Sequence, residues 1–185
     1  KDKFIAATDA FLSLAKSGED FMEYDFISEI PKDSAAKRKY LLEGYLFPDT
    51  YEIYLGSSEQ TIMAKQISQF NKVFSDKYRA RAEKLGMTID QAVTLASIIQ
   101  KEANPDQFKQ VSAVLHNRLK KGMPLQSCAT VQYAKGVKRM NLTDADLAYD
   151  SPYNTYKYAG YPEGPICNPS KKAIEAALYP DEEYL

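Results

Sequence analysis

The sequence has 185 residues, 44% hydrophobic and 26% charged, which is the balance of an ordinary globular domain with a substantial core. Its 24 basic and 25 acidic residues give a net charge of −1, so neither a nucleic-acid-binding surface nor an acidic tail is expected. No apolar run approaches the ~18 residues that a membrane span needs, and no signal peptide opens the chain.

The first quarter of the sequence predicts one helix followed by irregular structure. Apolar residues recur at helical spacing up to residue 17, and Gly18 ends this helix. Residues 19–40 are mixed and polar, with a turn predicted at residues 31–34. Residues 40–56 alternate aromatic and polar side chains around a Pro-Asp turn, which predicts short strands or an ordered loop. The opening residues are typical of the middle of a longer sequence, so we expect this chain to be a piece of a larger protein.

The middle of the chain predicts three amphipathic helices. Thr88 and Gln91 form a capping box that begins the second helix, and this helix ends with Glu102. Asn104 as N-cap and Pro105 at the first helical position begin the third helix, which stops at Gly122. The first helix is long and ends at Gly86, and its apolar face carries Ile62, Met63, Ile67, Phe70, Val73, Phe74 and Tyr78.

Turn residues become frequent after Met123. A short helix is predicted to begin at Thr143, and Ser170 caps a final helix. Between them, residues 149–170 form a long loop with four prolines and five tyrosines. These elements predict an α+β fold that is mainly helical, with small β elements and long aromatic-rich loops. We expect residues 1–39 to form an N-terminal helical segment and residues 40–185 to form the main domain.

Glu102 is the first candidate for chemistry. At ~100° per residue, Leu95, Ile98, Ile99 and Glu102 share one stripe of their helix, whereas Gln100 lies about 200° away. A carboxyl group that continues an apolar face is expected to lie in an apolar niche with a raised pKa, which suits a general acid. The alternative is a structural glutamate paired with Lys101, Lys109 or Arg118. The local pattern leaves both interpretations open.

The tyrosine-rich loop is the second candidate. Its five tyrosines stand among Asn154, Thr155 and Asn168. Flat aromatic faces beside amide groups suit sugar rings, which stack on the faces and hydrogen-bond to the amides. A loop packed by its own rings fits the pattern equally well. An acid together with a sugar-binding loop indicates chemistry on a glycosidic bond.

Other catalytic centres have little support in the sequence. Cys128 and Cys167 are too far apart for a CxxC site, and a single His116 without HExxH makes a zinc enzyme improbable, so no metal or other cofactor is expected. The two cysteines are compatible with a disulfide in an exported protein or with two buried thiols. His116 is expected to be a surface or hydrogen-bonding residue rather than the partner of a nucleophilic cysteine. The SxxK match at residues 34–37 lacks the other motifs of its class.

Five blocks, in order, resemble the catalytic domain of the endolytic murein transglycosylases of the MltG (YceG-like) family. The resemblance covers the chain from about Tyr40 to its end. The blocks are "LEGYLFPDTY" (42–51), "ASIIQKEA" (96–103), "NRLKKGMPLQSCATVQYA" (117–134), "SPYNTY" (151–156) and "GYPEGPICNP" (160–169).

The resemblance implies a lysozyme/transglycosylase-like catalytic domain on the outer face of the bacterial cell membrane, in a protein that is membrane-anchored by a segment outside this chain. Such enzymes cleave the MurNAc–GlcNAc bond within peptidoglycan glycan strands and leave 1,6-anhydro-MurNAc ends. The essential glutamate of the family matches Glu102. Peptidoglycan strands are therefore the expected partner, and cell-wall synthases are further candidate partners.

This chain departs from the family pattern at three places. Cys128 and Ala129 replace a commoner Asp-Pro pair, the LysM-like N-terminal segment is absent, and the closing C-terminal hairpin of relatives is expected to be missing. Many relatives also carry an acid where this chain has Gln100, a change expected to be harmless because Gln100 faces away from Glu102.

The family mechanism needs one carboxyl group that acts first as acid and then as base, since the sugar's own 6-hydroxyl attacks C1. The remaining site residues are expected to orient the sugar. They are Gln126, Asn154 and Tyr156, and then Glu43, Tyr45, Asn117 and Ser127. The alternative function is a non-catalytic glycan-binding or scaffold module of the cell-wall synthesis machinery.

Overall fold

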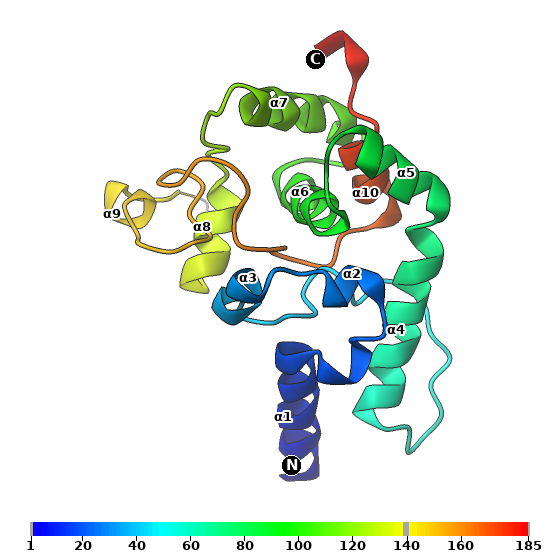
Figure 1. Cartoon of the computed structure of the whole chain (residues 1–185). Coiled ribbons are helices and arrows are strands. Elements are labelled where there is room, and N and C mark those ends of the chain that lie inside the picture. The colour runs from blue at the N-terminus through cyan, green and yellow to red at the C-terminus, as the bar shows by residue number, and fades with distance from the viewer. Residues whose placement is uncertain (1, 139–140, 185) are drawn as a thin grey trace.

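The computed structural model describes residues 2–138 and 141–184, and in these residues the fold is almost entirely helical (Figure 1). None of the helices in these ranges is long and apolar enough to cross a membrane. The elements are α1 (Asp2–Ser17), the 3-10 helix η1 (Glu19–Phe21), α2 (Asp25–Ser28), α3 (Lys32–Lys37), α4 (Glu59–Val73), α5 (Asp76–Lys84), α6 (Ile89–Glu102), α7 (Phe108–Lys120), α8 (Cys128–Lys135), α9 (Asp144–Leu147), α10 (Lys171–Leu178) and the 3-10 helix η2 (Glu182–Tyr184).

Helix α6 lies at the centre of the fold. Figure 1 shows it end-on, surrounded by α7, α5 and α10, and residues 92–99 are all buried. The predicted capping box is confirmed, because the Thr88 hydroxyl accepts from the Gln91 N–H at 3.1 Å and the Thr88 N–H donates to Gln91 Oε1 at 3.0 Å. The start and the end of the central helix are therefore both where the sequence predicts them.

The long helix predicted before Gly86 is two helices. Phe74 leaves the helical conformation at ψ 63, and Ser75 begins α5 as its N-cap. The predicted apolar face still packs inward, and Phe70, Phe74 and Tyr78 follow one another through ring contacts at 5.6 and 6.1 Å. The break turns α5 toward α6 and α10 while the aromatic face stays continuous.

The predicted β elements are wrong for the described residues, which contain one isolated bridge between Pro124 and Gly160 and no strand. Residues 40–56 form turns and loop instead. The side-chain carbonyl of Asn168 accepts from the backbone N–H groups of Gly44 at 2.8 Å and Leu46 at 3.2 Å. The Asn168 side chain thus accepts backbone hydrogen bonds that a neighbouring strand would accept in a sheet.

The N-terminal segment packs on the rest of the chain. The turn predicted at residues 31–34 belongs to α3, and Phe21, Phe26 and Ile27 are buried in the same core as α6. The division of the chain at residue 40 stays a prediction.

A buried arginine ties this segment to α6. The Arg38 side chain, 1% exposed, donates to both Asp90 carboxylate oxygens at 2.9 and 2.6 Å, and its Nε donates to the Glu163 carbonyl at 3.0 Å. Gly164 lies against the guanidinium, where an added Cβ would come within 2.7 Å of Nε. Arg38 thus joins three segments that are distant in sequence.

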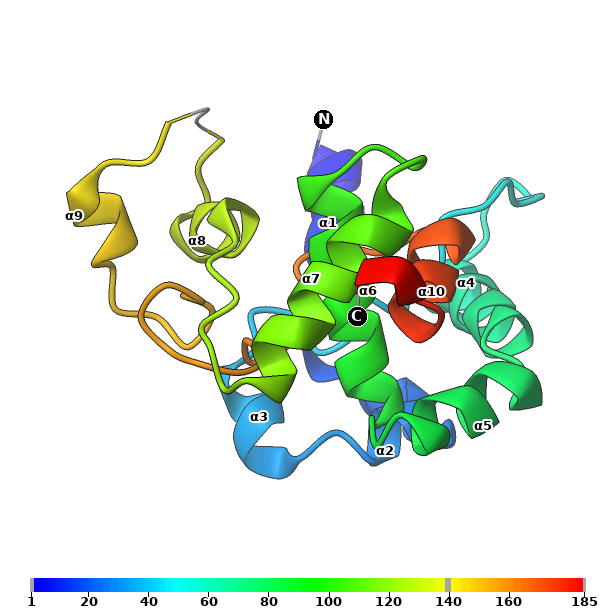
Figure 2. The same cartoon turned by 90° about the horizontal axis from the view of Figure 1, so that it is seen from above.

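The last helices agree only in part with prediction. Helix α7 begins at Phe108, four residues after the predicted N-cap Asn104, because residues 105–107 form a turn first. Helix α8 was not predicted. The caps at Thr143 and Ser170 are confirmed, each accepting from the N–H three residues ahead. Figure 2 shows α8 and α9 set to one side of α6 and α7.

Candidate active site

Glu102 is the last residue of α6, where the central helix leaves the core. Leu95, Ile98 and Ile99, which share its stripe, are fully buried as predicted. Glu102 itself is exposed, so the apolar niche predicted around it is wrong. The stripe identifies the buried face of the helix, but α6 ends at the surface and its last side chain lies outside the core.

The exposed carboxyl group is held in place by α8. Its Oε1 atom accepts hydrogen bonds from the Ser127 hydroxyl and from the Ala129 backbone N–H, the latter at 3.2 Å. Both donors lie at the N-terminal end of α8, where N–H groups have no partner within the helix. No described residue bonds Oε2. One oxygen of the carboxyl group is therefore fixed, and the other is open to a ligand.

Ser127 occupies the N-cap position of α8. A serine there usually accepts a hydrogen bond from an N–H of the first turn, and losing such a cap costs ~1 kcal/mol. The Ser127 hydroxyl makes no cap bond and donates to Glu102 instead. The start of α8 is thus arranged around the carboxyl group at the expense of the helix's own cap.

The alternative of a structural ion pair is wrong for the described residues. None of Lys101, Lys109 and Arg118 forms an ion pair with Glu102. Arg118 donates to the Pro124 carbonyl at 2.7 Å and to Gln126 Oε1 at 2.8 Å. The carboxyl group therefore has no cation bound to it in the part of the chain that the structure describes.

Gln126 has a strained backbone directly before this contact. Its φ of 56° lies in the left-handed region, which costs a non-glycine residue of order 1–3 kcal/mol and is enriched at functional sites. Its N–H donates to the Thr155 carbonyl at 3.0 Å, while its exposed side-chain NH2 group bonds no described residue. Gln126 is well placed to contact a ligand.

Thr155 holds the loop before α8. Its hydroxyl accepts from the Ser127 N–H at 3.0 Å and lies 2.9 Å from the Thr130 hydroxyl, which in turn donates to the Ser127 carbonyl at 2.8 Å. All three residues are buried. Thr155, Thr130 and Ala129 are not among the site residues predicted from the sequence. The only indication was that they stand next to predicted ones.

Tyr156 lies beside the same helix end. Its hydroxyl is 3.0 Å from the Cys128 sulfur, and burial together with this hydrogen bond raises the pKa of Tyr156 to about 12. The charge on Glu102 also acts to raise this pKa. At neutral pH the phenol is protonated, so Tyr156 can donate a hydrogen bond to a ligand.

Asn154 does not face a ligand site. It is fully buried, its Nδ2 donates to the carbonyls of Leu147 at 2.8 Å and Tyr149 at 2.7 Å, and its Oδ1 accepts from the Tyr156 N–H at 3.0 Å. The prediction that Asn154 orients a sugar is therefore wrong in this conformation. Its amide folds the loop that carries Thr155 and Tyr156.

Tyr45 and Asn117 are also placed elsewhere. Tyr45 is fully buried and donates to Asp90 Oδ1 at 2.6 Å, inside the Arg38 network. Asn117 donates through Nδ2 to the Tyr184 carbonyl at 2.6 Å and so fastens the C-terminal residues to α7. Neither side chain bonds Glu102 or Ser127, and their role in substrate binding stays a prediction.

Glu43 contacts α8 one turn beyond Ala129. Its Oε2 accepts from the Tyr133 hydroxyl at 3.4 Å, a long contact. Burial raises the pKa of Glu43, although the Tyr133 hydrogen bond, Lys101 and Lys39 act in the opposite direction. Burial beside Glu43 likewise raises the pKa of Tyr133. Helix α8 thus contacts two carboxyl groups: that of Glu102 through Ala129, and that of Glu43 through Tyr133.

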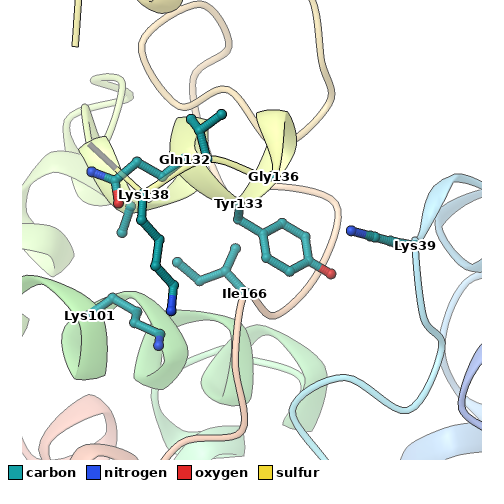
Figure 3. Close-up of a pocket in the computed structure, with 9 residues that line it drawn as sticks. Lys39, Lys101, Gln132, Tyr133, Gly136, Lys138 and Ile166 are labelled. Carbon is teal, nitrogen blue, oxygen red and sulfur yellow. The ribbon is translucent and has the colours of Figure 1, made fainter. Parts of the chain in front are cut away.

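A cavity of about 310 Å³ opens between α8 and the end of α6. It includes Ala129, which bonds Glu102, and Lys101, the neighbour of Glu102 in sequence. Figure 3 shows Lys101 and Lys138 pointing toward one another on one side of Tyr133, with Lys39 pointing in from the other side. Its lining residues are Lys39, Lys101, Ala129, Gln132, Tyr133, Gly136, Val137, Lys138 and Ile166.

The tyrosine-rich loop combines the two arrangements considered for it. Tyr153 is buried and packs on Tyr133 with ring centroids 4.9 Å apart, so part of the loop is held by its own rings. Tyr149 and Tyr158 are 40% and 46% exposed and offer surface to a ligand. The Tyr158 hydroxyl is bound to Asp150 Oδ1 at 2.6 Å.

The remaining candidate nucleophiles are separate structural groups. Cys128 and Cys167 are free thiols, and Cys167 lies 3.4 Å from the Ser97 carbonyl with a pKa that burial raises to about 11. His116 Nε2 is 2.8 Å from the Ala177 carbonyl, and burial lowers its pKa.

Gln100 accepts from the Ser170 N–H at 3.0 Å, so it faces α10 rather than Glu102, as predicted.

Comparison with known proteins finds a family match over most of the chain. A family model described as the YceG-like family matches residues 6–185. A relative from Bacillus subtilis (strain 168), named endolytic murein transglycosylase, is 42% identical over 151 residues, which are 80% of this chain and 41% of the relative. A relative of the same name from Streptococcus pneumoniae serotype 2 (strain D39) is 37% identical over 153 residues, 80% of this chain and 27% of the relative.

The fold also matches a solved structure. The crystal structure of a yceG-like protein from Listeria monocytogenes superposes with a TM-score of 0.78 at 35% sequence identity, covering 94% of this chain and 58% of that chain. This chain spans less than half the length of the two curated relatives.

Proposed function

The chain belongs to the YceG-like family, and on that premise we propose that it is the catalytic segment of an endolytic murein transglycosylase. In this proposal it cleaves the MurNAc–GlcNAc bond inside peptidoglycan strands and leaves a 1,6-anhydro-MurNAc end. The names of the two relatives support the activity, although they describe longer proteins. The lysozyme-like character of the fold also stays a prediction.

The arrangement around Glu102 carries the proposal. A general acid must be reachable by substrate and must hold a constant orientation. Glu102 is exposed, its Oε1 is fixed by Ser127 and Ala129, and its Oε2 bonds no described residue. The open oxygen of a carboxyl group held in this way is available to a glycosidic oxygen, which supports the proposal.

The proposed reaction uses this one carboxyl group twice. Glu102 first gives its proton from Oε2 to the glycosidic oxygen, and the C1–O bond breaks with oxocarbenium character at C1. The carboxylate that remains is stabilised at Oε1 by the Ser127 hydroxyl and by the N-terminal N–H groups of α8. Glu102 then takes the proton from the sugar's 6-hydroxyl as this oxygen closes on C1. No water is consumed.

Two side chains are proposed to orient the sugar. Gln126 presents a side-chain NH2 group to solvent beside Ser127, and Tyr156 presents a protonated hydroxyl beside Cys128. Both come from segments that Thr155 holds together. The partners and place of action follow from the substrate: peptidoglycan strands outside the cytoplasmic membrane, with cell-wall synthases as further partners.

Hydrolysis is the second candidate reaction, because α8 brings Glu43 to the turn next to Glu102. A hydrolase needs a second carboxyl group to activate water or to form a covalent intermediate. The half-buried position of Glu43 behind Tyr133 favours the transglycosylase. The products distinguish the two, since hydrolysis leaves a reducing end that is heavier by one water than the anhydro end.

The test is mass spectrometry of isolated sacculi digested with the protein. We expect anhydro-ended fragments from the wild type and none from Glu102→Gln, with folding and glycan binding retained. The matched control is Glu83→Gln, an exposed glutamate on α5 with no contact to the site. Glycan binding without any product from the wild type would overturn the enzyme proposal in favour of a non-catalytic binding module.

A further inference from the structure

The cavity between α8 and the end of α6 collects positive charge. Three of its lining side chains are lysines that come from different segments: Lys39 after α3, Lys101 on α6 and Lys138 after α8. Figure 3 shows their side chains directed toward the cavity around Tyr133. All three lysines are exposed, so their ammonium groups can be reached by an anionic ligand.

These lysines bind no carboxylate among the described residues. Other lysines of the chain do so: Lys37 lies 3.7 Å from Glu163, Lys135 contacts Asp146, and Lys157 lies 2.9 Å from Asp150. The Lys39 ammonium lies over the face of the Tyr40 ring, 5.6 Å from its centroid. The cavity therefore presents donors that are not used within the described chain.

Two carboxyl groups bond residues that line the cavity. Glu102 is bound at Ala129, and Glu43 lies behind Tyr133. Burial raises the pKa of Glu43 in spite of Lys39 and Lys101, which disfavours its charged form. Among the described residues, three lysines line the cavity, whereas these two carboxyl groups do not, and the charged form of Glu43 is disfavoured.

We propose that this cavity binds a carboxylate of the peptide stem carried by the muramic sugar next to the bond that is cleaved. The proposal rests on the proposed function and adds a subsite to it. Each MurNAc carries its peptide on the lactyl group at C3, so a stem must leave the strand close to Glu102. The volume of about 310 Å³ suits a small ligand group. Ile166, Val137 and Tyr133 supply an apolar wall for the peptide backbone and side chains.

The test compares two substrates in one assay. Glycan strands with intact stems and strands freed of stems by an amidase are digested by wild type and by the double variant Lys39→Gln/Lys138→Gln. The measured quantity is the ratio of kcat/KM for stem-bearing over stem-free strands. We expect this ratio to fall at least about tenfold in the variant, since hydrogen bonds to charged groups contribute at this level.

The matched control is Lys72→Gln/Lys84→Gln, which removes two exposed lysines from α4 and α5 and should leave the ratio unchanged. Thermal unfolding checks that each variant folds. A ratio that is equal in wild type and cavity variant would overturn the proposal. Absence of product from both substrates would instead overturn the proposed function.

Binding gives a separate readout that needs no turnover. In a Glu102→Gln background, calorimetry with stem-bearing strands, stem-free strands and inorganic phosphate compares the possible anions. We expect tighter binding of stem-bearing strands and loss of this difference in Lys39→Gln/Lys138→Gln. Equal binding of both strands, or lysine-dependent binding of phosphate alone, would contradict a stem-peptide subsite.

Discussion

The hydroxyl of Ser127 donates a hydrogen bond to Oε1 of Glu102, across 25 positions of sequence. Ser127 stands at the N-cap of α8, and its hydroxyl makes no bond to that helix. The orientation of the carboxyl group therefore depends on a side chain whose ordinary role would be to cap α8.

Replacing Ser127 with alanine separates catalysis from helix stability. We expect Ser127→Ala to lower kcat about 10- to 100-fold, the effect of removing one hydrogen bond to a charged group. Little stability should be lost, since no cap bond is removed. Ser170→Ala is the matched control, because the Ser170 hydroxyl does cap α10 at 3.3 Å. It should lose ~1 kcal/mol of unfolding free energy and keep activity. If Ser127→Ala instead lost stability and kept its activity, Ser127 would have only a structural role.

The Ala129 N–H can be removed without cutting a bond inside α8. Proline at this position deletes the 3.2 Å contact to Glu102, and the second residue of a helix has no helical partner for its N–H. The family resemblance implies that proline is common here. We therefore expect Ala129→Pro to lower kcat less than about tenfold, a smaller effect than Ser127→Ala. Steady-state kinetics of both variants test the order, and a larger loss in Ala129→Pro would reverse the assignment of the main donor.

Glu43 should make stability depend on pH. Burial raises its pKa in the folded state above the usual 4.5, so just above pH 4.5 the native state holds more protons than the unfolded state. The free energy of unfolding therefore falls as pH rises through this interval. Urea unfolding between about pH 4 and 7 should show this fall in the wild type and a flatter profile in Glu43→Gln. If the free energy of unfolding fell equally steeply with pH in Glu43→Gln and in Glu83→Gln, Glu43 would not be the cause of the fall.

Asn154 is expected to act through stability. Asn154→Ala leaves the carbonyls of Leu147 and Tyr149 without their donor and should cost about 1–3 kcal/mol of unfolding free energy. Asn71→Ala is the control, since it removes an exposed amide that binds Arg79 and should stay within about 0.5 kcal/mol of wild type. Chemical denaturation measures both. If Asn154→Ala were stable but inactive, the result would support the predicted contact between Asn154 and the sugar.

The helix ends that carry side-chain caps could be predicted from sequence, because a cap is a local pattern of one polar side chain and a nearby N–H. Thr88, Thr143 and Ser170 behave in this way. Helix α8 also has a serine at its N-cap position, but Ser127 makes no cap bond, and the sequence does not show which group its hydroxyl contacts. The sequence does carry signals for the C-terminal end of α8. Lys135 stands in its last turn, and Gly136 follows it as the C-cap with φ 66°.

Helical periodicity could place Glu102 in line with the buried face of its helix, but it left the role and the surroundings of the carboxyl group open. Periodicity gives the direction of a side chain and says nothing about where the protein surface lies. The same limit explains Tyr45 and Asn154, which stand in blocks typical of the family and are buried. Proximity in sequence to functional residues does not separate a side chain that touches substrate from one that shapes the loop beside it.

Every group that holds Glu102 comes from α8, whereas Glu102 belongs to the central helix. The carboxyl group and the donors that hold it therefore belong to different helices, and the arrangement is completed only when α8 is docked on the core. Mild heating or low denaturant that released α8 would leave a folded helical core. In that state the Glu102 carboxyl group would lose the two hydrogen bonds that fix its orientation. Inactivation would then come before unfolding, and it would reverse as soon as the helix returned.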